Sequence, residues 1–536
     1  MPVSNADEKW LRRAIESVQG QLYGRWELCI ADDRPSRPQV RKVLDEYSDG
    51  DARIKIAHRL KTGQMSEASN AALELACGEF AALLDPDDEL APHALYMVAE
   101  ELNVHPEADL IYSDEDKLDV DGERFDPHFK TDWNPDLLYS MNFVSHLAVY
   151  RTSVLKQIGG FRRGLEESQD YDLVLRFMEQ VPEDHVRHVP HVLYHARAIP
   201  DAANDERKQP AVEAARNAIR SHLERKGKTV EVAAAIHGHH RVIYPVPDPA
   251  PLVSLIIGTR DRSDLLKQAM DGILQTDYAP LEIVLVDNQT TAPESLEYLE
   301  KVQRDARIRV VRYDAPFNFS AINNLGVREA RGEVVCLLNN DTKIISPGWL
   351  KEMVSHALRP EVGAVGAKLY YANDTIQHAG VIIGIAGVAG HSHKHLARSG
   401  VGHAYRTMLL QGCSAVTAAC MVMRRSVFLE AGGLDELNLP IAFSDIDLCL
   451  RLRARGYRIV WTPYAELYHL ESASRGPETT LERSPAFARE CAYFRAKWKA
   501  QLPCDPYYNP NLTLDAEDFS LAAPPRHARP WERTAS

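Results

Sequence analysis

The chain has 536 residues, of which 45% are hydrophobic and 26% charged, and its formal net charge is −14. This length is too great for one hydrophobic core and predicts two globular domains, while the ordinary composition excludes a mostly disordered or fibrous chain. The acidic balance excludes a protein that wraps nucleic acid, because a nucleic-acid footprint is basic.

The cysteines and the hydropathy of the chain indicate the cellular compartment in which the protein is expected. The eight cysteines form no CxxC pair, and most lie in apolar runs such as VVCLL, which favours a reducing cytosol. The first residues carry no secretory signal pattern, and the longest uncharged apolar stretch, AGVIIGIAGVAG, is shorter than the roughly 20 residues that a membrane helix needs. We therefore expect a cytoplasmic protein, at most attached peripherally to the inner face of the cytoplasmic membrane.

Strands and helices alternate along both halves of the chain. In the first half, apolar periodicity predicts a helix, a strand, a helix and a strand over residues 7–18, 26–33, 65–78 and 80–88. In the second half it predicts a strand, helix, strand, helix and strand over 252–261, 264–274, 281–289, 320–332 and 334–342. This alternation is typical of an α/β fold with a mostly parallel, Rossmann-like sheet covered on both faces.

The middle of the chain predicts a domain boundary. Residues 210–227 predict a helix with a Gly stop, 229–235 a strand, and YPVPDPAP at 244–251 a stiff, extended linker. We therefore expect a first domain over 1–230, a linker over 231–251, a second domain over 252–515 and a loose C-terminal tail over 516–536.

Polar residues recur at matched positions in the two halves. Each lies where a strand ends or a helix begins. The spacing between the first two points is 53 residues in the first half and 52 in the second, and that between the last two is 25 and 24. Because ligands of such sheets gather at the carboxyl ends of the strands, a ligand site is expected in each half. The recurring pairs are Asp32 with Asp287, Asp85 with Asn339, Asp170 with Asp445, and His195 with His469.

Acidic clusters that follow apolar runs suggest a cation. In LLDPDDEL, Asp85 and Asp87 can bind Mg2+ or Mn2+ through carboxylate oxygens and leave positions for water and phosphate. In LLNNDTKI, Asn339 and Asp341 retain one carboxylate. A single cluster of this kind is more often a solvated turn, but its recurrence favours a metal that neutralises a diphosphate leaving group.

Two acids stand at the start of strongly periodic helices. Asp170 in DYDLVLRF and Asp445 in DIDLCLRL could be helix caps or general bases that take a proton from an attacking hydroxyl. His195 and His469 follow a Tyr at matched spacing and could complete a metal shell.

Other polar groups leave two interpretations open. Asp32 and Asp287 could form Asx-turns or accept a hydrogen bond from a nucleobase imide N–H. The clusters HGHH at 237 and HSHKH at 391 lack Cys partners with zinc-site spacing, so structural roles are favoured, and the second is expected to be a loop near the acceptor.

These residues belong to longer motifs. The first half contains CIADD, SEASNAALELACGEFAALLDPDDEL, YSDEDKLD and SQDYDLVLR. The second contains LVSLIIGTRDR, LVDNQT, FNFSAINNLGVREARGEVVCLLNND, SAVTAAC, FSDIDLCLRLRARGY and YAELYHLESASRG. Over nearly its whole length the chain resembles a tandem family 2 glycosyltransferase with two GT-A type domains, of the rhamnosyltransferase-like kind that builds bacterial surface polysaccharides.

The resemblance implies an inverting, metal-dependent enzyme. It implies a UDP- or dTDP-sugar donor, a glycan or lipid-linked glycan acceptor, Mg2+ or Mn2+ as cofactor, and no nucleic-acid partner. Direct displacement needs one base in each domain, in contrast to the two carboxylates of most glycoside hydrolases. The implied roles are nucleotide binding for Asp32, Asp287, Thr259 and Arg260, metal binding for Asp85, Asp87, His195, Asn339, Asp341 and His469, and base catalysis for Asp170 and Asp445.

Three features depart from the family pattern. The first domain of the family opens with a complete strand, of which only the MPV end is present here. Ser4 stands where the family has an aromatic residue, which would loosen nucleotide binding. Gly258 replaces a Pro, and Ser444 replaces an acidic or amide residue before the base, and both changes are mild because Asp445 remains.

Three alternatives remain at this point. Only residues 252–510 could be catalytic, with the first domain an acceptor-binding platform, which the shortened first strand favours. A sugar-phosphate nucleotidyltransferase would share the sheet and metal, but the Gly-rich signature near the N-terminus is missing. A non-enzymatic module that binds divalent cations or glycans would leave the repeated base-like Asp unexplained.

Overall fold

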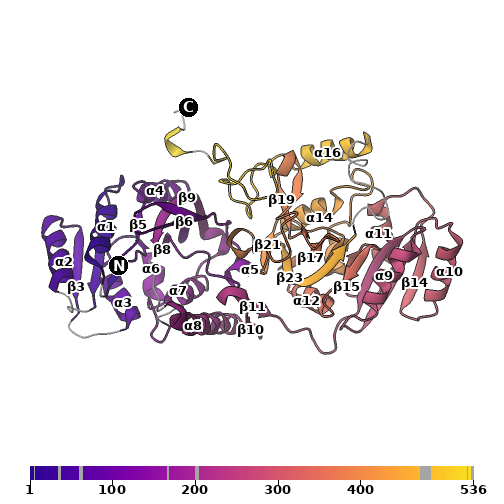
Figure 1. Cartoon of the computed structure of the whole chain (residues 1–536), viewed down its shortest axis with the longest axis horizontal. Helices are drawn as coiled ribbons and strands as arrows, with labels where there is room; N and C mark the ends of the chain where they lie inside the picture. Colours follow the sequence, from indigo (N-terminus) through magenta and orange to yellow (C-terminus); the bar gives the residue numbers. More distant parts are fainter. Residues whose placement is uncertain are drawn as a thin grey trace. The chain divides into compact units, whose positions relative to one another are not determined.

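The structure is a computed structural model that describes residues 1–4, 6–33, 38–59, 64–165, 168–198, 204–470, 485–527 and 529–532. It divides into two compact units (Figure 1). The first unit comprises Met1–Trp133, Leu138–Val242 and Arg526–Ser536, and the second comprises Asn134–Leu137 and Ile243–Pro525. The main crossing between units therefore falls at residue 243, inside the segment expected to be a linker.

The first unit begins with a small parallel sheet. Helix α1 begins after Asp7, whose side chain accepts a hydrogen bond from the backbone N–H of Lys9, and it buries Leu11, Ile15 and Val18. The sheet has the order β1-β2-β3, and its strands run parallel. The elements are β1 (Pro2–Val3), α1 (Glu8–Gln19), β2 (Leu28–Asp32), α2 (Pro38–Gly50) and β3 (Ile54–His58).

A second, mixed sheet completes the first unit. Its order is β4-β8-β6-β9-β5, with β7 paired to β6, and β6 runs parallel to β9. The elements are α3 (Met65–Leu75), β4 (Phe80–Ala82), β5 (Glu89–Leu90), α4 (Ala94–Val104), β6 (Leu110–Leu118), β7 (Arg124–His128), β8 (Ala148–Arg151), α6 (Thr152–Gln157), α7 (Gln169–Phe177), η2 (Glu183–His185), β9 (Val186–Arg197) and α8 (Asn204–Arg225). The short helix α5 (Pro135–Leu138), which follows β7 in the chain, belongs to the second unit except for Leu138.

The segment expected to be a linker is partly structured. Strands β10 (Glu231–Ala234) and β11 (His240–Ile243) pair with one another around the short helix η3 (Ile236–Gly238). Val232 and Val242 are buried, which favours this pairing over an extended chain. The linker expected over 231–251 is therefore a hairpin as far as residue 243, and only the Pro-rich part that follows lacks a helix or strand.

The second unit is built on one ten-stranded sheet. Its strand order is β14-β13-β12-β15-β22-β17-β23-β16, with β18 paired to β17 and β21 paired to β23. The strands are β12 (Val253–Thr259), β13 (Leu281–Asp287), β14 (Ile308–Arg312), β15 (Val334–Leu338), β16 (Thr342–Ile344), β17 (Val362–Tyr370), β18 (Ile376–His378), β21 (Gln411–Cys413), β22 (Cys420–Arg424) and β23 (Arg458–His469).

Helices and short elements surround this sheet. A separate two-stranded sheet joins β19 (Val381–Ile383) and β20 (Ala389–His391). The helices are α9 (Ser263–Ile273), α10 (Pro293–Val302), α11 (Phe319–Glu329), α12 (Trp349–Ala357), α13 (Arg425–Glu430), α14 (Ser444–Arg453) and α16 (Pro485–Lys497), with the short helices η4 (Ile385–Gly387), η5 (His403–Tyr405) and η6 (Pro530–Glu532), the last of which lies in the first unit.

The core of the second unit lies on both faces of its sheet. Along β12, Ile256 belongs to one buried apolar cluster, whereas Leu255 and Ile257 belong to another. Successive residues of a strand point to opposite faces, so a strand that is apolar throughout must be covered on both sides. The α/β class is confirmed. The sheet is mixed: β14, β13, β12 and β15 run parallel to one another, as do β17 and β23, whereas β22 is antiparallel to both of its neighbours.

The C-terminal segment is less loose than expected. The ring of Phe519 stacks on that of His393 with centroids 4.0 Å apart, and Leu512 forms a β-bridge with Leu521. An aromatic ring packed on an imidazole removes apolar surface from water, which explains why the second unit extends to Pro525.

The two units share one order of strands. The sequence β3-β2-β1 followed by β4-β8-β6-β9-β5 in the first unit matches β14-β13-β12 followed by β15-β22-β17-β23-β16 in the second. The difference lies between β1 and β4, which are not paired, whereas β12 and β15 are. The repeat seen in the sequence is therefore also a repeat of topology.

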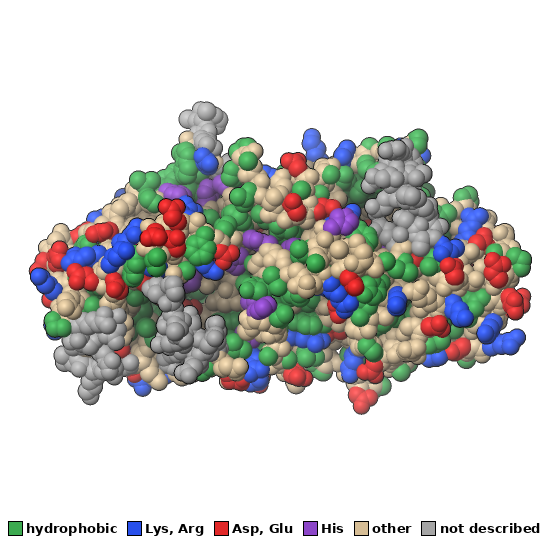
Figure 2. Space-filling view, in the orientation of Figure 1, with side chains coloured by type: hydrophobic (Ala, Val, Ile, Leu, Met, Phe, Trp, Pro, Cys, Tyr) green, Lys and Arg blue, Asp and Glu red, His purple; other side chains and the backbone are tan. Residues whose placement is uncertain are grey.

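The surface carries mixed charge. On the face shown in Figure 2, acidic and basic side chains are interspersed and form no single basic patch. Among the described residues, no helix is both long enough and apolar enough to span a bilayer.

Candidate functional site

Asp287 lies at the carboxyl end of β13 in the second unit and is fully buried. Its Oδ1 accepts a hydrogen bond from the backbone N–H of Thr290 at 3.0 Å, and its Oδ2 lies 2.8 Å from Nη1 of Arg312. Thr259 is paired with Asp287 across the sheet and is also buried. The side chain of Arg260 is 53% exposed, so it lies at the surface beside this pair.

Asp32 occupies the same place in the first unit. It closes β2, is buried, and its Oδ2 lies 3.1 Å from Nδ1 of His58. In the sheet, Asp32 pairs with His58 as Asp287 pairs with Arg312. Each unit therefore presents a buried carboxylate with a basic partner on the neighbouring strand.

Three residues expected to be metal ligands meet in the second unit. Nε2 of His469 lies 3.1 Å from Nδ2 of Asn339 and 3.2 Å from Oδ1 of Asp341. Nδ1 of His469 lies 2.8 Å from Oε1 of Gln377, a contact that requires Nδ1 to be the donor. In that tautomer the Nε2 lone pair points toward Asn339 and Asp341, which suits a cation held by a carboxylate oxygen and an imidazole. The Asn339 side chain presents its amide nitrogen here, so it would offer its oxygen to a cation only after a half-turn of the amide.

In the first unit, the residues that could bind a metal ion differ from those expected from the sequence. Atoms of Asp85, Asp88 and His146 lie within 4.8 Å of one another, an arrangement that could hold a metal ion. Asp87 and His195 lie outside this group, and Nδ1 of His195 is 2.5 Å from Oδ1 of Asp116 instead. Two carboxylates and an imidazole form a donor set that fits a divalent cation.

The ladder between strands explains why Asp88 takes this place. Glu89 pairs with His195 between β5 and β9, and Thr342 pairs with His469 between β16 and β23. The residue just before Glu89 is Asp88, and the residue just before Thr342 is Asp341, so these two acids correspond. An alignment of the two sequences from the end of the apolar run would instead match Asp341 with Asp87, because the cluster DPDD is one residue longer than NND.

Charges around Asp88 and His146 are strongly coupled. Burial and the neighbouring charge of Asp85 raise the pKa of Asp88 to about 7, although Tyr194 Oη donates a 2.6 Å hydrogen bond to it. Burial alone would lower the pKa of His146, but its 2.8 Å contact with Glu115 outweighs burial, and the pKa is raised to about 9. Perturbed pKa values in a cluster of this kind are typical of ligand sites.

Two family models match this chain. The model described as glycosyl transferase family 2 matches residues 1–159, and the model described as glycosyltransferase like family 2 matches residues 249–486. The chain belongs to glycosyltransferase family 2. The two matches fall in the two halves that share one topology, which confirms a tandem glycosyltransferase with two GT-A type domains.

Curated relatives resemble this glycosyltransferase over its whole length. An uncharacterised protein, y4gI, of Sinorhizobium fredii is 48% identical over 98% of this chain and 58% of its own length. The O-antigen biosynthesis protein RfbC of Myxococcus xanthus is 39% identical over 100% of this chain and 41% of its own length. The chain thus spans about half the length of these relatives.

Solved structures show a more distant likeness. The mannosyltransferase PcManGT of Pyrobaculum calidifontis, in complex with GDP-Man and Mn2+, is 18% identical with a TM-score of 0.37, and the match covers 56% of this chain and 77% of that one.

In the second unit of the glycosyltransferase, two acids on the first turn of α14 differ in their partners. Asp447 is fully buried, and its carboxylate lies 2.8 Å from Arg451 and 2.7 Å from Lys497. Asp445 is half-buried and accepts hydrogen bonds from the backbone N–H groups of Ala418 and Ile446, both at 2.9 Å. No ion pair joins Asp445 to a described cationic side chain, so it is the acid of this turn that can accept a proton.

The pKa of each proposed base is raised. Burial raises the pKa of Asp445, and hydrogen bonds from the backbone oppose the effect. Burial and the charge of Asp85 raise the pKa of Asp170 to about 6, although His146 opposes them. The influence of Asp85 and His146 also shows that Asp170 lies close to the acidic group of the first unit. A raised pKa makes a carboxylate a stronger base toward a hydroxyl.

Sequence reasoning missed Asp88, His146 and Gln377. The doubled acid of DPDD was a signal for Asp88. His146 lies in the apolar stretch MNFVSHLAVY, and only the antiparallel pairing of β4 with β8 brings it to Asp85. Gln377 shows no signal in the sequence, because its role depends on a contact with a histidine far along the chain.

Proposed function

We propose that both units catalyse inverting transfer of a sugar from a nucleoside diphosphate donor to a growing polysaccharide or glycolipid, with Asp445 and Asp170 as the bases. The donor is a UDP- or dTDP-sugar, the cofactor is Mg2+ or Mn2+, and the enzyme acts in the cytoplasm at the inner face of the membrane. Membership of family 2 and the similarity to a protein named for O-antigen biosynthesis support this proposal.

One relationship in the second unit carries the proposal. Oδ2 of Asp445 accepts a hydrogen bond from the N–H of Ala418, and the N–H of Asn339 donates to the carbonyl of the next residue, Ala419, at 3.0 Å. A carboxylate that forms no ion pair within the described part of the chain therefore lies one residue away from a cluster that suits a cation and a diphosphate. An acceptor hydroxyl bound over this segment would lie between a base and a leaving group.

The chemistry follows from these positions. Asp445 removes the proton from the acceptor hydroxyl. The oxygen attacks the anomeric carbon, and the bond from that carbon to the diphosphate oxygen breaks on the opposite face, so the leaving group keeps the electron pair. Asp287 and Thr259 hold the nucleotide at the carboxyl end of the sheet. Asp170 and Asp32 take the corresponding roles in the first unit.

A divalent cation would be held by one group in each unit. These groups are Asn339, Asp341 and His469 in the second unit, and Asp85, Asp88 and His146 in the first. When bound, the cation neutralises the charge that develops on the diphosphate.

The test is release of nucleoside diphosphate from UDP-, dTDP- and GDP-sugars with Mn2+. The intact chain is compared with Asp445→Asn and Asp170→Asn, and with Asp271→Asn and Asp49→Asn, which change exposed acids on α9 and α2. Loss of turnover of a different donor in each base variant, with both controls active, supports two active units. Full turnover in both base variants would show that neither acid is the base.

A second candidate is that only the second unit is catalytic and the first binds the acceptor. A difference between the two candidate cation groups favours it, because His146 takes part in the first unit where His469 does so in the second. In that case Asp445→Asn removes all turnover and Asp170→Asn removes none. A chain that binds Mn2+ but turns over no donor, even with purified polysaccharide acceptor added, would instead support a non-enzymatic binding module.

A further inference from the structure

Tyr194 on β9 contacts every member of the candidate cation group of the first unit. Its side chain is fully buried, and its Oη donates a 2.6 Å hydrogen bond to Oδ2 of Asp88. The same oxygen accepts a hydrogen bond from the backbone N–H of Asp85 at 3.3 Å. The ring of Tyr194 stacks on the imidazole of His146, with centroids 4.6 Å apart and an angle of 13° between the planes. One side chain therefore joins the three residues that could hold the cation.

The pairing of strands explains why Tyr194, and not its neighbour His195, reaches this group. Between the parallel strands β6 and β9, Tyr194 lies opposite Glu115, and His195 lies opposite Asp116. Successive side chains of a strand point to opposite faces of the sheet. Glu115 therefore shares a face with Tyr194, and its Oε2 lies 2.8 Å from Nδ1 of His146. On the other face, Nδ1 of His195 lies 2.5 Å from Oδ1 of Asp116.

Two contacts fix the orientation of the His146 imidazole. An ionised carboxylate only accepts hydrogen bonds, so the contact with Glu115 makes Nδ1 of His146 the donor and leaves Nε2 for a cation. The stack on Tyr194 fixes the plane of the ring, because tilting the imidazole would give up its contact with the face of the phenol. The tautomer and the ring plane are therefore set by two residues that are neighbours across the sheet.

The hydroxyl of Tyr194 links the two ends of the acidic turn. Asp85 and Asp88 open and close DPDD, and Oη is bonded to the backbone of the first and to the carboxylate of the second. The other carboxylate oxygen of Asp88 accepts a 2.7 Å hydrogen bond from the backbone N–H of Arg197. Each carboxylate oxygen has two lone pairs, so these bonds orient Asp88 and still leave lone pairs for a cation.

The second unit uses the equivalent Tyr–His pair differently. Tyr468 and His469 are consecutive on β23, as Tyr194 and His195 are on β9. Oη of Tyr468 donates a 2.5 Å hydrogen bond to Oδ1 of Asp374, and His469 is the residue that lies in the candidate cation group. The side chain that reaches the cation group is thus the tyrosine in the first unit and the histidine in the second.

We propose that Tyr194 is a positioning residue for the cation of the first unit, with its hydroxyl holding Asp88 and its ring holding His146. This inference rests on the proposed function, because it concerns the cation that would bind the diphosphate there. Without the hydroxyl, the carboxylate of Asp88 is free to rotate away from Asp85 and His146, so the ligand atoms no longer converge. Glu115 acts together with Tyr194 by fixing the tautomer of His146.

The test measures Mn2+ binding by the full chain with Asp341→Asn also present, so that the second unit does not contribute. Tyr194→Phe removes only the hydroxyl, and Tyr194→Leu removes the aromatic ring as well. We expect Tyr194→Phe to lower the affinity about 10- to 100-fold in a titration followed by electron paramagnetic resonance. Tyr194→Leu should lower the affinity further, because His146 then loses its stacking partner.

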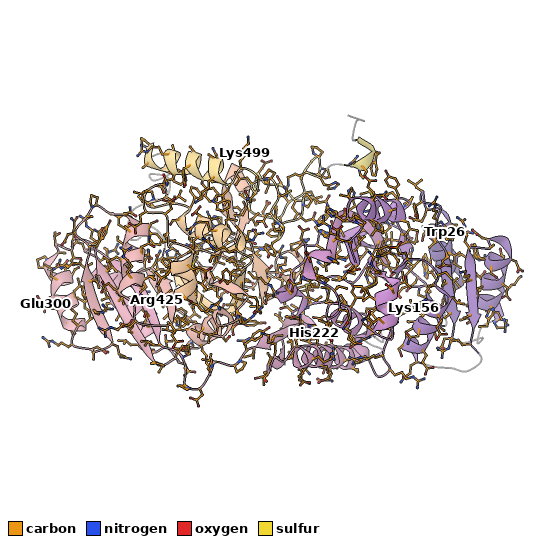
Figure 3. All side chains as sticks on the ribbon, turned by 180° about the vertical axis from the view of Figure 1, so that it is seen from behind. Trp26, Lys156, His222, Glu300, Arg425 and Lys499 are labelled. Atoms are coloured by element: carbon orange, nitrogen blue, oxygen red, sulfur yellow. The ribbon has the colours of Figure 1, made fainter. Side chains whose placement is uncertain are left out.

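Two buried tyrosines outside the group provide matched controls. Oη of Tyr112 donates a 2.7 Å hydrogen bond to the carbonyl of Thr131, and its ring stacks on His188 with centroids 5.0 Å apart. Tyr112→Phe therefore makes the same chemical change at another Tyr–His stack. Oη of Tyr139 lies 3.4 Å from Nε2 of His222 on α8, which is labelled in Figure 3, and Tyr139→Phe is the second control. Both control chains should bind Mn2+ as the parent chain does.

Two further measurements separate positioning from a purely structural role. Amide hydrogen exchange in β6 and β9 should be similar in Tyr194→Phe and Tyr112→Phe, since each loses one buried hydroxyl. Electron spin-echo modulation reports nitrogen bound to Mn2+. At saturating Mn2+ this modulation should persist in Tyr194→Phe, which keeps the stack on His146, and should weaken in Tyr194→Leu.

Each contrary outcome has a distinct meaning. Unchanged affinity in Tyr194→Phe, or an equal loss in Tyr112→Phe, would overturn the inference and leave the proposed function standing. A loss in Tyr194→Phe that accompanies faster exchange throughout the first unit would also overturn it, because the role would then be structural. Full nitrogen modulation in Tyr194→Leu would overturn the role given to the ring. Absence of Mn2+ binding by the parent chain would overturn the cation group itself, and the inference with it.

Discussion

Asp445 and Asn339 bind adjacent residues of one backbone segment, the first through the N–H of Ala418 and the second through the carbonyl of Ala419. Asp445 takes part through its side chain on α14 and Asn339 through its backbone N–H at the end of β15, and the two residues are more than a hundred positions apart in the sequence. Because both residues are bonded to the same backbone segment, the proposed base and the proposed cation site are held at a fixed position relative to one another. The following predictions test this arrangement and its counterpart in the first unit.

The two acids of α14 should differ in their contribution to stability. Asp447→Ala leaves Arg451 and Lys497 without their buried carboxylate, so it should cost about 3–5 kcal/mol of the free energy of unfolding. Asp445→Asn removes a charge that is paired with no cation among the residues that the structure describes, and it keeps a hydrogen-bond acceptor. It should therefore cost less than about 1 kcal/mol while abolishing turnover. Urea unfolding of the second unit measures both. Equal destabilisation by the two changes would contradict the division of roles.

Gln377 should orient His469 for a cation. Gln377→Ala removes the acceptor that fixes the His469 tautomer, and affinity for Mn2+ in the second unit should fall about 10- to 100-fold. Titration with Mn2+, followed by electron paramagnetic resonance, gives the affinity. Gln275→Ala, which changes an exposed residue after α9, is the control and should bind normally. Unchanged affinity in Gln377→Ala would show that His469 is not a ligand.

The acids of DPDD should not be equivalent. Because Asp88 lies with Asp85 and His146 and Asp87 does not, Asp88→Asn should weaken Mn2+ binding in the first unit more than Asp87→Asn does. A difference of at least about tenfold is expected, since one of two carboxylates is lost. The comparison is best made with Asp341→Asn also present, so that the second unit does not contribute. A larger loss with Asp87→Asn would restore the assignment first made from the sequence.

His188 should make the first unit sensitive to alkaline pH. Burial alone would lower the pKa of His188, but Asp114, at 2.9 Å, and Asp132, at 3.1 Å, outweigh it and raise the pKa to about 9. Because the folded pKa lies above the ordinary value of about 6.5, the stabilisation is complete below pH 6.5 and is lost as the pH rises through 9.

The measurement is urea unfolding of the first unit at pH 6.5 and pH 9.5, followed by hydrogen exchange in β6 and β9. The wild-type chain should lose stability between these values, and His188→Asn should lose less. His237→Asn, a change at an exposed position, should behave as the wild type does. An equal loss in His188→Asn and the wild type would contradict the assigned ion pairs.

Some site residues could be found from the sequence because their positions are set by local structure. Asp287 and Asp445 follow or open elements whose periodicity is strong, so the strand end and the helix start could be recognised without the fold. The recurrence of such points in both halves identified a repeat, and the common strand order of the two units accounts for it.

Other residues could not be found in this way. Asp87 and Asp88 have the same local sequence context, and the pairing of Glu89 with His195 decides which of them faces Asp85 and His146. Val242 reads as part of a linker until β11 pairs with β10, which is the strand expected over 229–235. In each case the deciding contact joins residues that are separated along the chain.

The sequence by itself determined the α/β class, the tandem repeat and the elements that carry the acids, because hydrophobic periodicity and turn chemistry act over a few neighbouring residues. Only the tertiary structure decided which acids lie beside a histidine and which are neutralised by cationic side chains. These outcomes depend on the order and alignment of strands in a sheet, which are fixed by long-range packing rather than by local propensity.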